Sequence, residues 1–223
     1  MKQWMIKSNR ADLSKIAARY KISEILAEVL VKRGLYDWEA MDAYLYPSMD
    51  KLHDVHAIYD LDHAVSIIRN KIENNQKIQV IGDYDVDGVM STSILVKGLR
   101  KLGAEVSWRV PHRERDGYGV RDYMAREAFE QDVDTIITCD NGISAVDAVA
   151  CAKELGMTVI VTDHHDIVKV GEEDVLPEAD AIVNPKQSAD TYPWKEICGG
   201  MVAYKLIQIL YEKAGIDREE WLG

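Results

Sequence analysis

The fold of this chain is decided by one stretch, residues 77–88, which reads Lys77-Ile78-Gln79-Val80-Ile81-Gly82-Asp83-Tyr84-Asp85-Val86-Asp87-Gly88. Its first half is a short apolar run, rich in β-branched residues and ended by a glycine, which predicts a buried strand. The next run, residues 89–102, has apolar side chains at helical spacing. Between the two, Asp83, Asp85 and Asp87 are crowded into a turn. Their mutual repulsion is costly unless a cation neutralises it or one carboxyl keeps its proton, so the turn is a candidate metal site.

Strand and helix patterns alternate through the rest of the chain. After the first strand, the sequence predicts further strands over residues 106–110, 134–138, 158–162 and 181–183, and helices over residues 122–130 and 144–155. Repeated strand–helix–strand units imply an α/β fold, a doubly wound and mainly parallel sheet with flanking helices. We therefore predict such a domain over residues 76–223, with a surface loop at residues 171–179.

Residues 1–75 have a different pattern, without strands. Amphipathic helices are predicted over residues 11–19, 22–33, 37–45 and 61–74, and Asp60 is a candidate cap for the last of them. These segments form a small helical N-terminal section, and the boundary between it and the α/β domain is expected near residue 75.

Composition narrows the classes of function. The chain has 223 residues, a formal net charge of -11 and 47% hydrophobic residues, which suits one large domain with a small companion. No apolar run reaches the roughly 18 residues of a membrane span, and the N-terminus lacks the pattern of a signal peptide, so we expect a cytoplasmic protein without a membrane partner. Three widely spaced cysteines argue against a disulfide framework and against a zinc cluster. The acidic balance argues against a broad basic nucleic-acid surface, but it leaves open phosphate substrates that are held through cations.

Polar residues follow two more of the predicted strands. Asp140-Asn141-Gly142 comes after the third strand, and Asp163-His164-His165-Asp166 comes after the fourth. Ligands of parallel sheets bind outside the carboxyl ends of the strands, so all three turns are expected at one edge. Oxygen ligands with one or two histidines favour Mn²⁺ or Mg²⁺, and several acidic groups suggest two cations. The alternative for Asp140-Asn141-Gly142 alone is an ordinary turn.

Two rival motifs explain less of the sequence. Asp83-x-Asp85-x-Asp87-Gly88 copies the first half of an EF-hand loop, but the twelfth position is Ile94 instead of a bidentate glutamate, and a strand precedes the loop. Asp85-x-Asp87 after a strand is similar to the nucleophile motif of haloacid-dehalogenase phosphatases. That motif does not account for the Asp-His-His sequence at residues 163–165.

The three turns together resemble the DHH phosphoesterase family, which is named after the Asp-His-His found here at residues 163–165. Residues 80–88, 140–142 and 162–165 match its first three motifs. Further sequence similarity to family members occurs at residues 110–113, 117–119, 184–186, 192–193, 198–200 and 202–205.

The resemblance implies a site of two Mn²⁺ or Mg²⁺ ions, at which water activated by the cations attacks phosphorus in line. It implies the metal ligands Asp83, Asp85, Asp87, Asp140 and His164. It also implies catalytic roles for His165 and Asp163, with His165 meeting the phosphate or the leaving group. Arg113, Arg115, Asn141 and Gly142 are candidate substrate-binding residues. An alternative for the two arginines is that they face solvent, because Glu114 and Asp116 alternate with them.

The family members with the most similar sequences digest single-stranded DNA from the 5′ end. The resemblance thus implies a 5′ exonuclease of DNA repair and recombination, with single-stranded DNA and other repair proteins as partners. We expect this chain to be its catalytic N-terminal part, because the family's fourth motif and C-terminal domain are not found before Gly223. Two alternatives stay open: a phosphoesterase for small substrates such as short oligonucleotides, cyclic dinucleotides or pyrophosphate, and a non-catalytic scaffold. The relatives that act on small substrates usually have a histidine just before the first aspartates, whereas residues 78–82 contain none.

Overall fold

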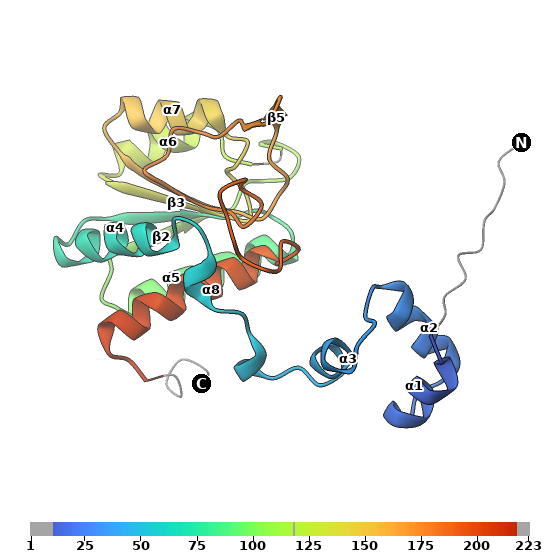
Figure 1. Cartoon of the computed structure of the whole chain (residues 1–223). Helices are drawn as coiled ribbons and strands as arrows, with labels where there is room; N and C mark the ends of the chain where they lie inside the picture. The colour runs from blue at the N-terminus through green and yellow to red at the C-terminus, as the bar shows by residue number, and fades with distance from the viewer. Residues whose placement is uncertain (1–10, 118, 218–223) are drawn as a thin grey trace, which may run out of the picture. The chain divides into compact units, whose positions relative to one another are not determined.

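The computed structural model describes residues 11–117 and 119–217 (Figure 1). The chain divides into two compact units, Met1–Leu52 and His53–Gly223, called here the helical unit and the sheet unit. No helix of the described residues is both long and apolar enough to cross a membrane.

The helical unit contains three short helices, α1 (Leu13–Tyr20), α2 (Glu24–Lys32) and α3 (Trp38–Leu45), followed by the 3₁₀ turn η1 (Met49–Lys51). Each α-helix begins after a residue whose side chain accepts a hydrogen bond from a backbone N–H of the first turn; these residues are Asp12, Ser23 and Asp37. The helices enclose a small core of Ile16, Tyr20, Ala27, Val31 and Met41. The three helices predicted in this part of the sequence are therefore confirmed.

The sheet unit is built on five parallel strands in the order β2-β1-β3-β4-β7. Their bounds are Ile78–Ile81 for β1, Val106–Arg109 for β2, Thr135–Cys139 for β3, Thr158–Thr162 for β4 and Ala181–Val183 for β7. The doubly wound parallel sheet is thus confirmed. The chain leaves β1 toward β2 on one side and continues on the other side with β3, so the strand order reverses between β1 and β3. Such a switch point opens a crevice at the carboxyl ends of the strands, where ligands bind.

Helices cover both faces of the sheet (Figure 1). One face packs on α4 (Leu61–Glu73), α5 (Val86–Lys101) and α8 (Gly199–Ala214), and the other on α6 (Asp122–Glu130) and α7 (Val146–Glu154). Neighbouring residues of one strand join different cores: Ile137 packs with the first group of helices and Ile136 with the second. Strands buried on both faces explain why their sequences are almost continuously apolar.

The division between the units differs from the sequence prediction. The contacts place it between Leu52 and His53, after which come the 3₁₀ turn η2 (Val55–Ala57) and α4. α4 belongs to the sheet unit because it packs on β7 and α8. Asp60, predicted to cap this helix, has no capping hydrogen bond from its side chain. Its Oδ2 accepts instead from Ile182 N at 2.7 Å and so ties the start of α4 to β7.

A second, smaller difference concerns residues 171–179, for which the sequence predicts a loop. The segment contains part of a short antiparallel hairpin of β5 (Lys169–Val170) and β6 (Glu173–Asp174). Ser188 fixes this hairpin through Asp174, since its N and Oγ donate to the two carboxylate oxygens at 2.7 and 2.9 Å.

Candidate metal centre

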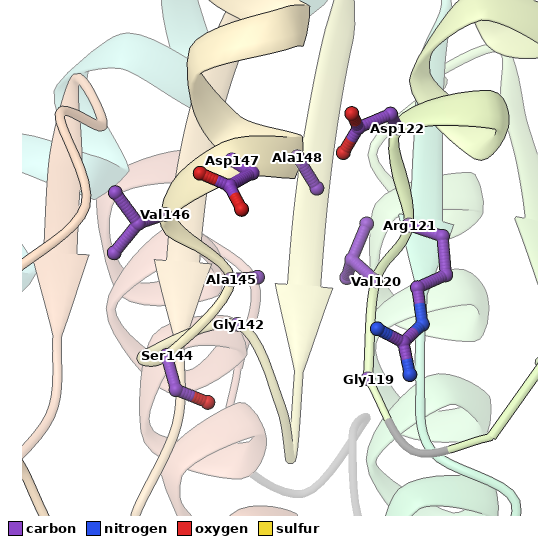
Figure 2. Close-up of a pocket in the computed structure, with 10 residues that line it drawn as sticks. All are labelled: Gly119, Val120, Arg121, Asp122, Gly142, Ser144, Ala145, Val146, Asp147 and Ala148. Atoms are coloured by element: carbon purple, nitrogen blue, oxygen red, sulfur yellow. The ribbon is translucent and has the colours of Figure 1, made fainter.

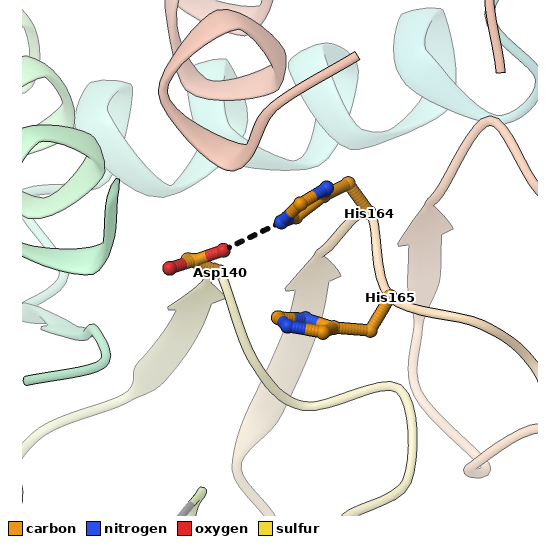
Figure 3. A group of neighbouring side chains, drawn as sticks. All are labelled: Asp140, His164 and His165. Carbon is orange, nitrogen blue, oxygen red and sulfur yellow. Dashed lines mark ion pairs between the residues drawn. The ribbon is translucent and has the colours of Figure 1, made fainter. Parts of the chain in front are cut away.

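The three predicted turns meet at the carboxyl ends of β1, β3 and β4, beside the switch point. They supply two groups of potential metal ligands. One is Asp83 with Asp85 and Asp140, and the other is Asp140 with His164 and His165, which Figure 3 shows. Within each group, one ligand atom from every residue lies within 4.8 Å of the others. Asp140 belongs to both groups, so a single carboxylate lies between two places that suit a cation.

The turn after β1 is held close to the start of α5. Asp85 caps that helix, because its Oδ1 accepts from Gly88 N at 3.0 Å. Gly88 has no room for a side chain, since a Cβ there would lie 2.5 Å from Asp83 O. Asp83 is only 3% exposed, and its Oδ1 receives no hydrogen bond from the described residues. Burial raises the pKa of Asp83, and the nearby charge of Asp85 raises it further.

Asp140 follows β3 in the left-handed region, with φ 59°, and is 2% exposed. His164 Nε2 lies 2.9 Å from Asp140 Oδ1 as an ion pair, but no well-aligned hydrogen bond reaches this oxygen from residues 11–117 or 119–217. Burial raises the pKa of Asp140, His164 lowers it, and the neighbouring charges of Asp87 and Asp85 raise it. The ionised carboxylate is thus short of positive charge.

The two imidazoles are held differently. The pKa of His164 is raised by Asp140, and the pKa of His165 is raised by Asp163. Asp163 Oδ1 accepts from His165 Nδ1 and His164 N, both at 2.7 Å, and Oδ2 accepts from Ile143 N at 3.0 Å. Since an ionised carboxylate only accepts, Nδ1 of His165 carries a proton, and a ligand would meet this ring at Nε2. Asp163, predicted to be catalytic, is completely buried and reaches a ligand only through His165.

Asp87 faces the start of α8. Its Oδ2 accepts from Gly199 N and its Oδ1 from Gly200 N, both at 2.7 Å, while Oδ2 lies 3.5 Å from His164 Nε2. Asp87 therefore lies beside His164 and outside both groups of ligands. A Cβ at Gly199 would lie 2.7 Å from Asp140 Oδ1, so this close approach requires glycine. The sequence reasoning assigned no role to the two glycines, although a Gly-Gly pair opening a helix signals a close backbone contact.

The four candidate substrate-binding residues have unlike surroundings. The Arg113 guanidinium lies 4.6 Å from the centre of the Tyr84 ring, and its charge lowers the pKa of Asp83, so this arginine reaches the site. Arg115 lies in the loop of Asp116, whose pKa is lowered chiefly by a hydrogen bond from His112 N and further by the charge of Arg115.

The other two candidates lie in the turn after β3. Gly142 has φ 107°, and any Cβ would overlap the Thr138 hydroxyl, so this position serves the turn itself. Asn141 is fully buried, and neither its Oδ1 nor its Nδ2 has a partner in the described part of the chain.

A cavity of about 210 Å³ lies next to this turn, lined by Gly142, Ser144 and the first turns of α6 and α7 (Figure 2). Arg121 lies on one wall, while Asp122 and Asp147 contribute two carboxylates. The lining therefore has more negative than positive charge, which does not favour a phosphate.

The donor set at the shared Asp140 fits a hard divalent cation. Carboxylate oxygens with one or two imidazoles suit Mn²⁺ or Mg²⁺ better than a structural zinc ion. Buried carboxylate oxygens without donors, at Asp83 and Asp140, are otherwise costly. A bound cation would offset that cost.

Comparison with known proteins identifies the family. The family model described as DHH family, N-terminal domain, matches residues 77–222. The chain belongs to the DHH family. Among curated DHH relatives, it is 39% identical over 209 residues to the single-stranded-DNA-specific exonuclease RecJ of Bacillus subtilis (strain 168), covering 93% of this chain and 26% of the relative. The RecJ of Haemophilus influenzae is 41% identical over 151 residues, which is 67% of this chain and 25% of that protein. The chain thus spans about a quarter of the length of these relatives.

Solved DHH structures are similar in fold. An exonuclease RecJ bound to manganese superposes with a TM-score of 0.66 and 33% identity, over 74% of this chain and 41% of that one. RecJ of Thermus thermophilus in complex with Mn²⁺ gives a TM-score of 0.67 and 26% identity, over 94% of this chain and 28% of that one.

Proposed function

We propose that this chain carries the catalytic site of a metal-dependent exonuclease that hydrolyses single-stranded DNA from its 5′ end. The observation that carries the proposal is the carboxylate of Asp140, shared by two groups of ligands at the switch point of the sheet. The similarity to relatives named single-stranded-DNA-specific exonucleases supports the choice of substrate. Cytoplasmic action in DNA repair and recombination, alongside other repair proteins, is part of the same proposal.

Mn²⁺ or Mg²⁺ is the proposed cofactor, with Asp83, Asp85, Asp140 and His164 as ligands and Asp87 as the adjacent carboxylate. Relatives have been solved with either metal. When bound, two such cations lower the pKa of water and neutralise charge on a phosphate. Asp83 and Asp140 would hold them at the carboxyl ends of β1 and β3, where both carboxylates are buried.

The remaining residues would act on the substrate. His165, oriented by Asp163, would donate from Nε2 to a phosphate oxygen or to the leaving group. Arg113 would attract the phosphate backbone toward the site from its place over Tyr84. Asn141 and Gly142 are proposed to act on the substrate only by shaping the turn that carries Asp140, because Asn141 is fully buried and Gly142 serves the turn. Arg115, whose charge acts on Asp116, would add only long-range attraction.

The test is hydrolysis of end-labelled oligonucleotides by the purified protein in the presence of Mn²⁺. We expect mononucleotides from single strands and no digestion of duplex. Asp85→Ala or His164→Ala should abolish hydrolysis, whereas Glu172→Ala, an exposed carboxylate between β5 and β6, should not change it. Equal rates for His164→Ala and the unmodified protein would show that the site is misassigned.

A further inference from the structure

A second hollow lies along the edge of the sheet, between α5 and β2. It has a volume of about 480 Å³. α5 lines it with Val89, Val96, Lys97 and Arg100, and the strand side contributes Trp108 and Val110. These residues define the α5–β2 groove. β2 is an edge strand of the sheet, so no further strand covers this side of it.

The chemistry of the α5–β2 groove is a mixture of apolar surface and positive charge. Trp108 is 59% exposed, and Val89 on the facing helix is also exposed. Lys97 and Arg100 lie on the same side of α5, three residues apart. None of the described residues that line the groove carries a carboxylate. In a chain with a net charge of -11, such a lining selects for a ligand that is both aromatic and anionic.

One end of the groove lies near the candidate metal centre. At one end, Val89 N donates to the backbone oxygen of Asp85 at 3.0 Å, so the groove starts one helical turn from a proposed metal ligand. From Val89 it follows α5 to Arg100, a distance of about 16 Å at the rise of an α-helix. Beyond Val110 the chain leads to Arg113, which packs over Tyr84 beside the same centre.

We propose that the α5–β2 groove binds single-stranded DNA, with a base stacked on Trp108 and backbone phosphates beside Lys97 and Arg100. This inference rests on the proposed function and deepens it, because it gives the strand a path toward the metal centre. Every base has a face that can stack on an aromatic ring, so binding of this kind does not depend on sequence. In a duplex those faces are covered by neighbouring bases, and the groove therefore contributes to the preference for single strands.

The first test measures binding of a fluorescein-labelled oligothymidylate by anisotropy, in EDTA so that nothing is hydrolysed. Loss of one stacking partner should raise the dissociation constant of Trp108→Ala roughly 5- to 100-fold. Trp108→Phe keeps an aromatic face and should lose much less. Trp194→Ala is the matched control: Trp194 is 58% exposed but lies in the segment before α8, so its removal should leave binding unchanged.

The second test measures the salt dependence of the same binding. Each phosphate contact that is lost should reduce the slope of log K against log salt by about 0.7. Lys97→Ala with Arg100→Ala should therefore flatten the slope, and Arg69→Ala, an exposed arginine on α4 that pairs with Glu73, should not.

Three results would overturn the proposal. The first is that the unmodified chain does not bind the oligonucleotide, and the second is that Trp108→Ala binds it equally well. The third is that Trp108→Ala changes only the sedimentation of the protein, which would make the groove an interface between copies. Hydrolysis in Mn²⁺ separates this inference from the proposed function. If the oligonucleotide binds but is not hydrolysed, the proposed exonuclease activity is refuted and DNA binding by the groove is not. If it is hydrolysed but its binding does not depend on Trp108, only DNA binding by the groove is refuted.

Discussion

Two carboxylates, Asp190 and Asp140, are almost equally buried and yet have opposite surroundings. The side chain of Asp190 is wholly buried and accepts from Tyr59 N at 2.8 Å, Tyr192 N at 2.7 Å and Lys195 Nζ at 2.8 Å. Asp140 has only the His164 ring as a charged partner among the described residues, and burial raises its pKa. Buried polar groups are normally paired, and the described residues supply three donors to Asp190 but no well-aligned donor to Asp140 Oδ1. A buried carboxylate with donors at both oxygens therefore serves the structure, whereas one with a buried oxygen that lacks a well-aligned donor is left for a ligand.

Asp190→Asn should have the largest effect on stability. The change replaces one oxygen of a buried carboxylate with an NH₂ group that faces hydrogen-bond donors, and we expect a loss of about 3 kcal/mol in the free energy of unfolding. Urea denaturation measures it. Asp140→Asn, in metal-free buffer at neutral pH, should lose much less stability, and an equal loss would show that the two carboxylates do not differ in this way. Because the pKa of Asp140 is raised, its ionised form weakens the folded state there, and the amide should be neutral or stabilising.

Asp163 is another buried carboxylate with donors at both oxygens, but it lies beside the candidate metal centre. If its role is to orient His165, Asp163→Asn should lower the rate of hydrolysis by about 10²-fold, the size of effect typical of orienting partners. The decisive measurement is a double-mutant cycle. Asp163→Asn should cost little more activity once His165→Ala is present, since both changes disable the same ring. Additive losses would mean that Asp163 acts independently of His165.

The smallest effect is expected for an exposed pair, His56 with Asp62, whose Nδ1 and Oδ2 lie 2.9 Å apart. Asp62 raises the pKa of His56 above its ordinary 6.5, and His56 lowers the pKa of Asp62 below its ordinary 3.8. The contribution of the histidine is complete below pH 6.5 and is lost as pH rises through its folded pKa. The contribution of the aspartate is complete above pH 3.8 and is lost as pH falls through its folded pKa.

The stabilisation by this pair is therefore greatest between pH 3.8 and 6.5. Solvent screens it to below about 1 kcal/mol. Unfolding of the protein and of His56→Gln should differ in that window and converge toward about pH 8, above the ordinary range of histidine titration. A difference that grows with pH would reverse the sign and contradict the pairing.

Much of the sheet unit could be predicted from local pattern. The strand at residues 78–81 is apolar, β-branched and ended by glycine, and parallel pairing alone is enough to bring Asp83, Asp140 and His164 to one edge. The local pattern does not show which of the acidic residues bind metal and which orient another side chain. Asp163 was grouped with the catalytic residues because it opens the Asp-His-His motif of the family, whereas its complete burial depends on β4 lying between β3 and β7.

Long-range contacts account for the other differences. Asp87 is 112 residues from Gly199, and nothing in its own turn indicates that its oxygens accept from the start of α8. In the same way, Asp60 fits the pattern of a helix cap, but its partner is Ile182, 122 residues away. The observed boundary between the units differs from the predicted one for the same reason. α4 is amphipathic like the helices before it, and only tertiary packing assigns it to the sheet unit.

The most direct measurement of the difference between Asp140 and Asp190 is calorimetric titration with Mn²⁺. The metal-free chain, Asp140→Asn and Asp190→Asn are compared at a temperature where all three are folded. If a buried carboxylate oxygen without a well-aligned donor is left for a cation, the unmodified chain and Asp190→Asn should bind Mn²⁺ alike, and Asp140→Asn should lose that binding. Mn²⁺ binding that survives in Asp140→Asn, or that is absent from the unmodified chain, would contradict the account.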